Sequence, residues 1–211
     1  MNRNTIENIF NFLKEKEGKE IPQTVLDFIA KEKFIQELEN HPDGIQYKHN
    51  GDLLLVNTNI TKLPNDLHVT GNFGLENCKQ ITELPKKLYV GGNLLIAETN
   101  IAKLSNDLYV GGNLQLAKLG ITKLPNDLHV RGSFKLYGCE ELTELPDNLY
   151  VKEFFVLAGC NQIIELPNNL YVGGALHMTN TPLAKKYTNE EIYEIVASTG
   201  GQIIGQIYKY K

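Results

Sequence analysis

The stretch ITKLPNDLHV occupies residues 60–69, and the same ten letters occur again at residues 121–130. The two copies are 61 positions apart, which is the length of three consecutive units of 21, 20 and 20 residues. The units start at a glycine, or once at a glutamate, at these positions: Gly51, Gly71, Gly92, Gly112, Gly132, Glu153 and Gly174. A fixed period of this length predicts a solenoid, in which each turn buries its apolar face against the neighbouring turns.

Each unit contains a segment with the period of a β-strand. In LHVTGNFGL, at residues 67–75, every second residue is apolar or glycine, which predicts extended backbone with one buried face. The glycine that recurs inside this segment indicates either close packing or a bend that splits the strand in two, and both remain open. The later Leu-Pro pair marks the point where the chain leaves the sheet, because proline has no N–H to donate. We therefore expect a mainly β protein, a parallel β-solenoid of 20–21-residue units.

Two columns of apolar residues are expected to line the inside of this solenoid. The first column is Leu53, Phe73, Leu94, Leu114, Phe134, Phe155 and Leu176. The second column is Leu55, Leu75, Ile96, Leu116, Leu136, Leu157 and Met178. Parallel strands are spaced at about 4.8 Å, so equivalent side chains of adjacent turns are expected to touch.

The three cysteines, Cys78, Cys139 and Cys160, each lie seven residues after the start of a unit. In other units this slot holds Thr58, Thr99, Leu119 or Thr181. We interpret the slot as a buried position for a small side chain that hydrogen-bonds the turn, with a redox or metal site as the alternative. The repeat places Cys139 and Cys160 on adjacent turns.

Both ends of the chain carry helical patterns that we expect to cap the solenoid. Apolar residues recur with helical spacing in residues 4–17 and 22–40. Thr188 and Glu191 form a capping-box pattern for another helix, and the closing stretch GQIIGQIYKY is expected to form a strand. The expected organisation is one structural domain with a helical N-terminal cap at 1–45, the solenoid at 46–184 and a helix-plus-strand C-terminal cap at 185–211. The N-terminal helices are alternatively a module that binds a partner.

The unit L-x-L-x-x-[T/C]-x-(x)-I-x-x-L-P resembles the leucine-rich repeat, in particular the short bacterial type whose units carry Leu-Pro. It departs from that pattern in two ways. Thr or Leu replaces the Asn that is usual at the turn, and the segment L-[H/Y]-V-x-G lengthens the strand region. The phrase LP-x-x-L-x-V-x-G-x-L-x-L is also similar to that of repeat proteins from phages and their bacterial hosts. The likeness covers about residues 51–211. It implies a solenoid fold and, for a phage-type protein, interference with a host or defence protein.

Composition and charge disfavour several classes of partner. The net charge of −4 leaves no excess of Lys and Arg to neutralise nucleic-acid phosphates. No run of 18 apolar residues is present, and the N-terminus lacks the apolar stretch of a signal peptide. We expect no nucleic acid or membrane partner and a cytoplasmic location, in the bacterial host cell if the protein is phage-encoded.

No motif predicts catalysis, a cofactor or a bound metal. The five histidines form no metal-binding pair, and the glycine-rich VGGNL phrases recur as strand punctuation without a phosphate-binding Lys-Ser/Thr. We therefore expect a protein that is not an enzyme.

The remaining candidates are surface residues. One outward position holds an aromatic or imidazole side chain in six consecutive units: His68, Tyr89, Tyr109, His129, Tyr150 and Tyr171. Such residues favour strands and stack across rungs, and tyrosine also supplies contact area at low entropic cost. A second, less uniform outward set contains Asn72, Asn93, Asn113, Gln115 and Lys135. We expect these two sets to bind a protein partner.

Two other functions remain open. The first is binding of a glycan or small ligand along the Tyr/His column, and the second is a structural component, such as a virion protein, that self-associates. A further column beside Leu-Pro is charged throughout and is interpreted as a solvated face: Lys62, Glu83, Lys103, Lys123, Glu144 and Glu165.

Overall fold

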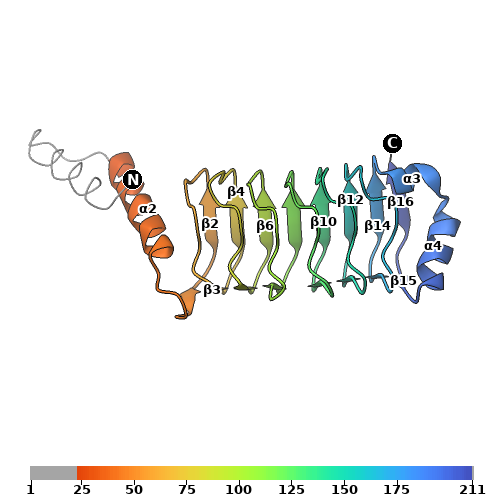
Figure 1. Cartoon of the computed structure of the whole chain (residues 1–211), viewed down its shortest axis with the longest axis horizontal. Coiled ribbons are helices and arrows are strands. Elements are labelled where there is room, and N and C mark those ends of the chain that lie inside the picture. The colour runs from red at the N-terminus through yellow and green to blue at the C-terminus, as the bar shows by residue number, and fades with distance from the viewer. Residues whose placement is uncertain (1–22, 211) are drawn as a thin grey trace, which may run out of the picture.

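The structure, a computed structural model, describes residues 23–210, which form a parallel β-solenoid (Figure 1). The helix expected at residues 4–17 lies outside the described residues. Each turn contributes a long strand and a short strand, and each strand runs parallel to its counterpart in the next turn. The mainly β fold class predicted from the repeat is therefore confirmed.

The long strands form one continuous eight-stranded sheet, in the order β16-β14-β12-β10-β8-β6-β4-β2. They are β2 (Leu53–Val56), β4 (Phe73–Glu76), β6 (Leu94–Ala97), β8 (Leu114–Ala117), β10 (Phe134–Tyr137), β12 (Phe155–Ala158), β14 (Leu176–Thr179) and β16 (Ile207–Tyr210). We call the outward surface of this sheet the long-sheet face.

The short strands form two four-stranded sheets, in the orders β1-β3-β5-β7 and β15-β13-β11-β9. They are β1 (Tyr47–His49), β3 (Asp66–Val69), β5 (Lys87–Val90), β7 (Tyr109–Val110), β9 (His129–Val130), β11 (Tyr150–Val151), β13 (Tyr171–Val172) and β15 (Gln202–Ile203). We call their outward surface the short-strand face. The third side of each turn is the Leu-Pro segment, which forms no strand.

The recurring glycines serve both a bend and close packing. β3 ends at Val69 and β4 begins at Phe73, so the chain turns a corner around the glycine between them. A Cβ atom built on Gly111 lies 2.3 Å from the carbonyl oxygen of Gly91 in the preceding turn. The two interpretations that the sequence left open therefore hold together.

One apolar core runs through the inside of all the turns. Both predicted inward columns are buried, and no member exposes more than 2% of its surface. The columns are in register, since Phe134 and Phe155 stack with ring centroids 5.3 Å apart. The threonine and cysteine slot is buried as well, and Thr58 Oγ1 lies 3.2 Å from Cys78 Sγ.

The helix α2 (Gln23–Glu39) lies at the N-terminal end of the solenoid (Figure 1). Its residues Ile35 and Leu38 join the core. The Lys31 ammonium donates to the carbonyl oxygen of Val56 at 3.1 Å. The Glu39 carboxylate accepts from the backbone N–H and the hydroxyl of Thr61, at 2.6 and 2.8 Å. The helix predicted at 22–40 is thus confirmed from Gln23 to Glu39.

Two helices, α3 (Pro182–Lys186) and α4 (Asn189–Ser198), lie at the opposite end (Figure 1). The predicted capping box is present, because Thr188 N–H donates to the Glu191 carboxylate at 2.7 Å and Glu191 N–H donates to the Thr188 hydroxyl at 3.2 Å. After α4 the chain forms two strands where the sequence indicated one. These strands, β15 and β16, pair in register with β13 and β14 and so add another rung to both faces.

Candidate functional site

The six predicted His and Tyr side chains lie in one column on the short-strand face, which we call the aromatic stripe. The parallel register places each of them beside its counterpart in the next strand. Neighbouring rings stack nearly parallel, with centroid distances of 4.1 Å for His68–Tyr89, 4.5 Å for Tyr89–Tyr109, 4.1 Å for His129–Tyr150 and 4.7 Å for Tyr150–Tyr171. The stripe is therefore a stacked array, as expected for cross-strand aromatic pairs.

The aromatic stripe consists of two stacks of three rings. In the described part of the chain, Tyr109 and His129 do not stack and β7 does not pair with β9. Arg131 lies at this break, with its guanidinium carbon 5.1 Å from the centroid of the Tyr109 ring. The break coincides with the turn in which Arg131 takes the position held by Gly91 and Gly111 in the two preceding turns.

Arg131 also affects the pKa of one ring of the stripe, His129. Partial burial lowers the pKa of His129, and the positive charge of Arg131 lowers this pKa further. The His129 ring is consequently neutral down to a lower pH than a free histidine. A neutral imidazole offers a partner one hydrogen-bond donor and one acceptor.

The stripe presents ring edges and hydroxyl groups to solvent, because stacking covers the ring faces. Tyr89 is 37% exposed. Among the described residues, no group hydrogen-bonds the hydroxyls of Tyr89, Tyr109, Tyr150 and Tyr171. A hollow of about 350 Å³ lies beside the first stack and is lined by Asp66, Lys87, Leu88, Tyr89, Asp107 and Tyr109. This surface can make hydrogen bonds and edge contacts to a partner.

The three predicted asparagines form a ladder at the bend between the strands. The side-chain oxygen of Asn72 accepts the backbone N–H of Asn93 at 2.8 Å, and that of Asn93 accepts the N–H of Asn113 at 2.8 Å. The ladder begins at Asp52, where the backbone N–H of Asn72 donates at 2.7 Å and lowers the pKa of this carboxyl. It ends at Ser133, whose N–H donates to Asn113 at 2.7 Å. These contacts give the asparagines a structural role, which the sequence analysis did not foresee.

Gln115 and Lys135 occupy a different surface from both the stripe and the ladder. They lie side by side on β8 and β10 and point outward from the long-sheet face. The same side of the solenoid carries exposed apolar residues that were not predicted as site residues, including Leu54, Tyr137 and Phe154, which are 64%, 37% and 51% exposed. The alternation of the long strands contained this signal, because every position between two inward residues points outward.

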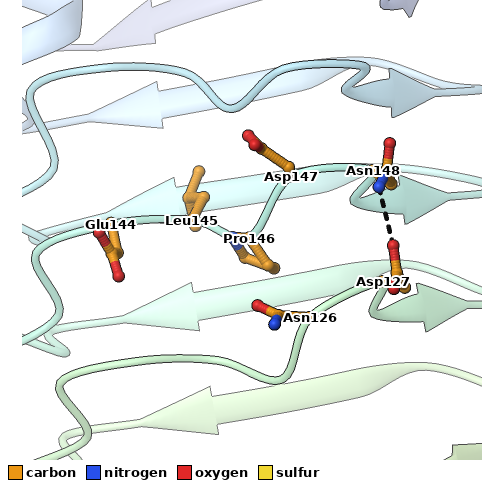
Figure 2. Close-up of a pocket in the computed structure, with 7 residues that line it drawn as sticks. All are labelled: Asn126, Asp127, Glu144, Leu145, Pro146, Asp147 and Asn148. Carbon is orange, nitrogen blue, oxygen red and sulfur yellow. Dashed lines mark hydrogen bonds between the residues drawn. The ribbon is translucent and has the colours of Figure 1, made fainter.

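The charged column on the Leu-Pro side is exposed, as predicted. Figure 2 shows the hollow on this side, of about 400 Å³, which is lined by Asn126, Asp127, Glu144, Leu145, Pro146, Asp147 and Asn148. The Asn148 amide donates to the Asp127 carboxylate at 2.8 Å, whereas Glu144 and Asp147 point away from each other (Figure 2). Within residues 23–210, no three His, Cys, Asp or Glu side chains form a group that can hold a metal ion.

The cysteines lie inside the solenoid and are free thiols. Cys139 and Cys160 are on adjacent turns, as predicted. The interaction between their thiols lowers the pKa of Cys139, whereas the same interaction and burial raise the pKa of Cys160. Because all three sulfurs are buried, the geometry matches a structural slot.

No helix among the described residues combines the length and the apolar character needed to span a bilayer. Comparisons with protein-family models, with curated proteins and with solved structures find no match. The geometry of the faces is therefore the basis for a functional proposal.

Proposed function

We propose that this protein binds another protein through the aromatic stripe and catalyses no reaction. The observation that supports the proposal is the stacking of six outward-facing His and Tyr rings in two ordered arrays, with centroid distances of 4.1–4.7 Å. Tyrosine is enriched at protein interfaces and at their energetic hot spots, since it combines a large apolar ring with a hydroxyl.

Stacking also prepares the stripe for binding. The middle ring of each stack, Tyr89 or Tyr150, is held between two neighbours, and each end ring packs against one, so the side-chain rotamers are restricted before a partner arrives. Fixing a flexible side chain at an interface costs about 0.5–1.5 kcal/mol, and a preorganised ring avoids most of this cost. The hydroxyls that lack a partner in the described structure then provide directional hydrogen bonds.

The same geometry disfavours glycan binding along the stripe. Sugar rings stack on open aromatic faces, whereas here most faces are covered by a neighbouring ring. The face of Tyr109 that turns toward the break is further occupied by the guanidinium of Arg131. A protein partner that contacts ring edges and hydroxyls fits the surface better.

End-to-end assembly, as in a self-associating structural protein, is also disfavoured. Sheet edges invite pairing when their backbone groups are free. At the C-terminal edge, the Asn189 amide donates to Ile207 O at 2.9 Å and the Tyr193 hydroxyl donates to Gly205 O at 2.7 Å. At the N-terminal edge, Lys31 donates to Val56 O. At each end, groups of a capping helix thus occupy edge carbonyls that a neighbouring strand would otherwise use.

For the biological setting, our proposal is a leucine-rich-repeat-like, phage-type protein that acts in the cytoplasm of a bacterium on a host or defence protein. It is supported by the resemblance of the repeat phrase to those of phage and bacterial repeat proteins.

The test is affinity capture with matched variants. The purified chain is immobilised, incubated with bacterial lysate, and the bound proteins are identified by mass spectrometry and titrated individually. The stripe variant is Tyr89→Ala/Tyr109→Ala/Tyr150→Ala, and the control on the Leu-Pro side is Lys62→Ala/Lys103→Ala/Lys123→Ala.

We expect the control to retain the partner and the stripe variant to lose at least about tenfold in affinity, since hot-spot truncations each cost more than about 1 kcal/mol. Recovery of no partner, or equal binding by both variants, contradicts the proposal. Selective binding on a glycan array supports the alternative ligand class.

A further inference from the structure

The short-strand face carries two positive charges side by side at the middle of the aromatic stripe. Arg131 and Lys152 occupy the same outward column, because the register of β9 and β11 continues to them through the bond from Lys152 N–H to Val130 O at 3.0 Å. Both residues are exposed, and we call them the basic pair. The other turns hold uncharged residues in this column, namely Asn50, Thr70, Gly91, Gly111, Gly173 and Ile204.

No carboxylate of the described chain neutralises the basic pair. The ion pairs among residues 23–210 are Lys118–Glu98 and Lys123–Glu144, on other parts of the solenoid. Adjacent strands lie about 4.8 Å apart, so two like charges at the same register are unfavourable for the fold. An anionic group supplied from outside the described chain would relieve this repulsion.

Arg131 keeps its hydrogen-bond donors available for such a group. Its guanidinium carbon lies 5.1 Å from the centroid of the Tyr109 ring. Stacking on a ring face leaves the in-plane N–H groups of a guanidinium free, and these groups match a carboxylate in a bidentate arrangement. Within the part of the chain that the structure describes, no group accepts a hydrogen bond from this side chain.

The break between β7 and β9 adds a backbone donor at the same residue. In other turns the N–H of this column donates to the preceding turn, as Gly111 N–H does to Val90 O at 2.8 Å and Gly173 N–H to Val151 O at 2.9 Å. Because β7 and β9 do not pair, Arg131 N–H has no such acceptor among the described residues. Arg131 thus offers both a cation and a free main-chain donor.

We propose that the basic pair receives a carboxylate from an acidic segment of the partner protein. This inference rests on the function proposed above, because it specifies the chemistry of the partner that the aromatic stripe binds. The carboxylate contacts the Arg131 guanidinium and the Lys152 ammonium. The ring edges and hydroxyls of Tyr109 and Tyr150 contact the rest of the segment.

The opposite edge of the stripe favours a protein segment over a continuous polyanion. Asp107 and Asp127 lie two residues before Tyr109 and His129, and both are exposed. A nucleic acid laid across the stripe would meet these carboxylates, and the net charge of −4 adds to the repulsion. A protein segment can place a carboxylate on the basic pair and neutral or basic side chains on the acidic edge.

The test selects a random library of displayed linear peptides against the immobilised full chain. The variant Arg131→Gln/Lys152→Gln removes both charges of the basic pair. The matched control, Lys62→Gln/Lys103→Gln, removes the same charge from two exposed residues of the Leu-Pro side. Circular dichroism confirms that both variants are folded. Selected peptides are synthesised and titrated individually, beside a single-stranded DNA oligonucleotide of equal length.

We expect the wild type and the control to select peptides enriched in Asp and Glu, and the variant of the basic pair to lose this enrichment. A selected acidic peptide should bind that variant about tenfold more weakly than the wild type. Its affinity for the wild type should fall as salt is added, because salt screens exposed charges. Replacing its carboxylate by an amide should weaken binding to the wild type and not to the variant, since both changes remove the same contact.

The proposal is overturned by selected peptides without an acidic bias, by recovery of no binding peptide, or by a bias that survives Arg131→Gln/Lys152→Gln. Tighter binding of the oligonucleotide than of the peptides also overturns it, because the preferred ligand would then be a polyanion.

Failure of this inference is distinguishable from failure of the proposed function. A lysate partner that is lost by Tyr89→Ala/Tyr109→Ala/Tyr150→Ala but bound normally by Arg131→Gln/Lys152→Gln supports the aromatic stripe and contradicts a role for the basic pair. An acidic peptide that requires the basic pair but binds the tyrosine variant normally supports the basic pair and contradicts the proposed role of the stripe.

Discussion

Replacing Gly111 by alanine tests how the turns pack against each other. A Cβ atom at this position lies 2.3 Å from the backbone oxygen of Gly91, a contact that real structures do not tolerate. The matched control is Gly120→Ala, because a Cβ at Gly120 meets no atom within 4 Å. Both substitutions add one methyl group and restrict the unfolded chain equally, so their difference isolates the close approach of the two turns.

The expected magnitude follows from the hydrogen bonds that the shift disturbs. Gly111 N–H donates to Val90 O at 2.8 Å, and Gly112 N–H donates to Gly92 O at 2.9 Å. Loss of two such bonds costs about 1–3 kcal/mol, and relief of the overlap adds about 1–3 kcal/mol. The fold itself should survive, because Lys152 occupies the same column and still donates to Val130 O.

Stability is measured by thermal unfolding, and hydrogen exchange reports which turns lose protection. The two contributions amount to about 2–6 kcal/mol, so we expect Gly111→Ala to lower Tm by roughly 4–24 °C, at about 2–4 °C per kcal/mol for a chain of this size. Gly120→Ala should leave Tm unchanged or raise it by about 1–3 °C. The reasoning is refuted if the two variants are equally stable, or if exchange increases far from these turns and not beside them.

Three further outcomes follow from the structure. Asn93→Ala removes two side-chain hydrogen bonds of the ladder, from Asn113 N–H and to Asn72 Oδ1, and should lower the free energy of unfolding by about 1–3 kcal/mol in a denaturant titration. Asn126→Ala, at an exposed amide, should change it by less than about 0.5 kcal/mol. Arg131→Gln should raise the pKa of His129 in an NMR titration. Because the pKa of His129 is lowered in the folded state, the free energy of unfolding decreases as pH falls below the ordinary histidine value. Arg131→Gln should make this decrease smaller. An unchanged titration curve would show that the guanidinium does not act on the ring. All three buried thiols should react with an aromatic disulfide reagent only after denaturation, and rapid reaction of the native protein would contradict their burial.

Much of the fold was predictable because packing of the core requires the sequence to repeat. An apolar residue occupies the position of Leu114 in every unit, at intervals of 20 or 21 residues, because each turn must present an apolar side chain to the turns before and after it. The alternation of inward and outward positions in the strands follows from backbone geometry alone. The capping box at Thr188 was readable for a similar reason, since its contacts lie within a four-residue stretch of chain.

The candidate site was less predictable, because equal spacing in the sequence does not reveal what a side chain contacts. Asn93 looked like a variable outward residue, but its oxygen accepts a backbone N–H of the next turn. The Tyr/His column looked continuous, but it consists of two stacks, with Arg131 over the Tyr109 ring at the break between them. Each of these features depends on contacts between residues about 20 positions apart, at distances that the repeat does not specify.

The amino-acid sequence by itself determined the solenoid, its period, its inward columns and the adjacency of Cys139 and Cys160, because local periodicity and burial dictate them. Only the tertiary structure decided that the chain bends at the glycines into two strands per turn and that its two faces differ, one with stacked rings and one with an open apolar surface. The physical reason is that a face is made of side chains from many turns, so its shape and chemistry exist only once the turns are stacked in register.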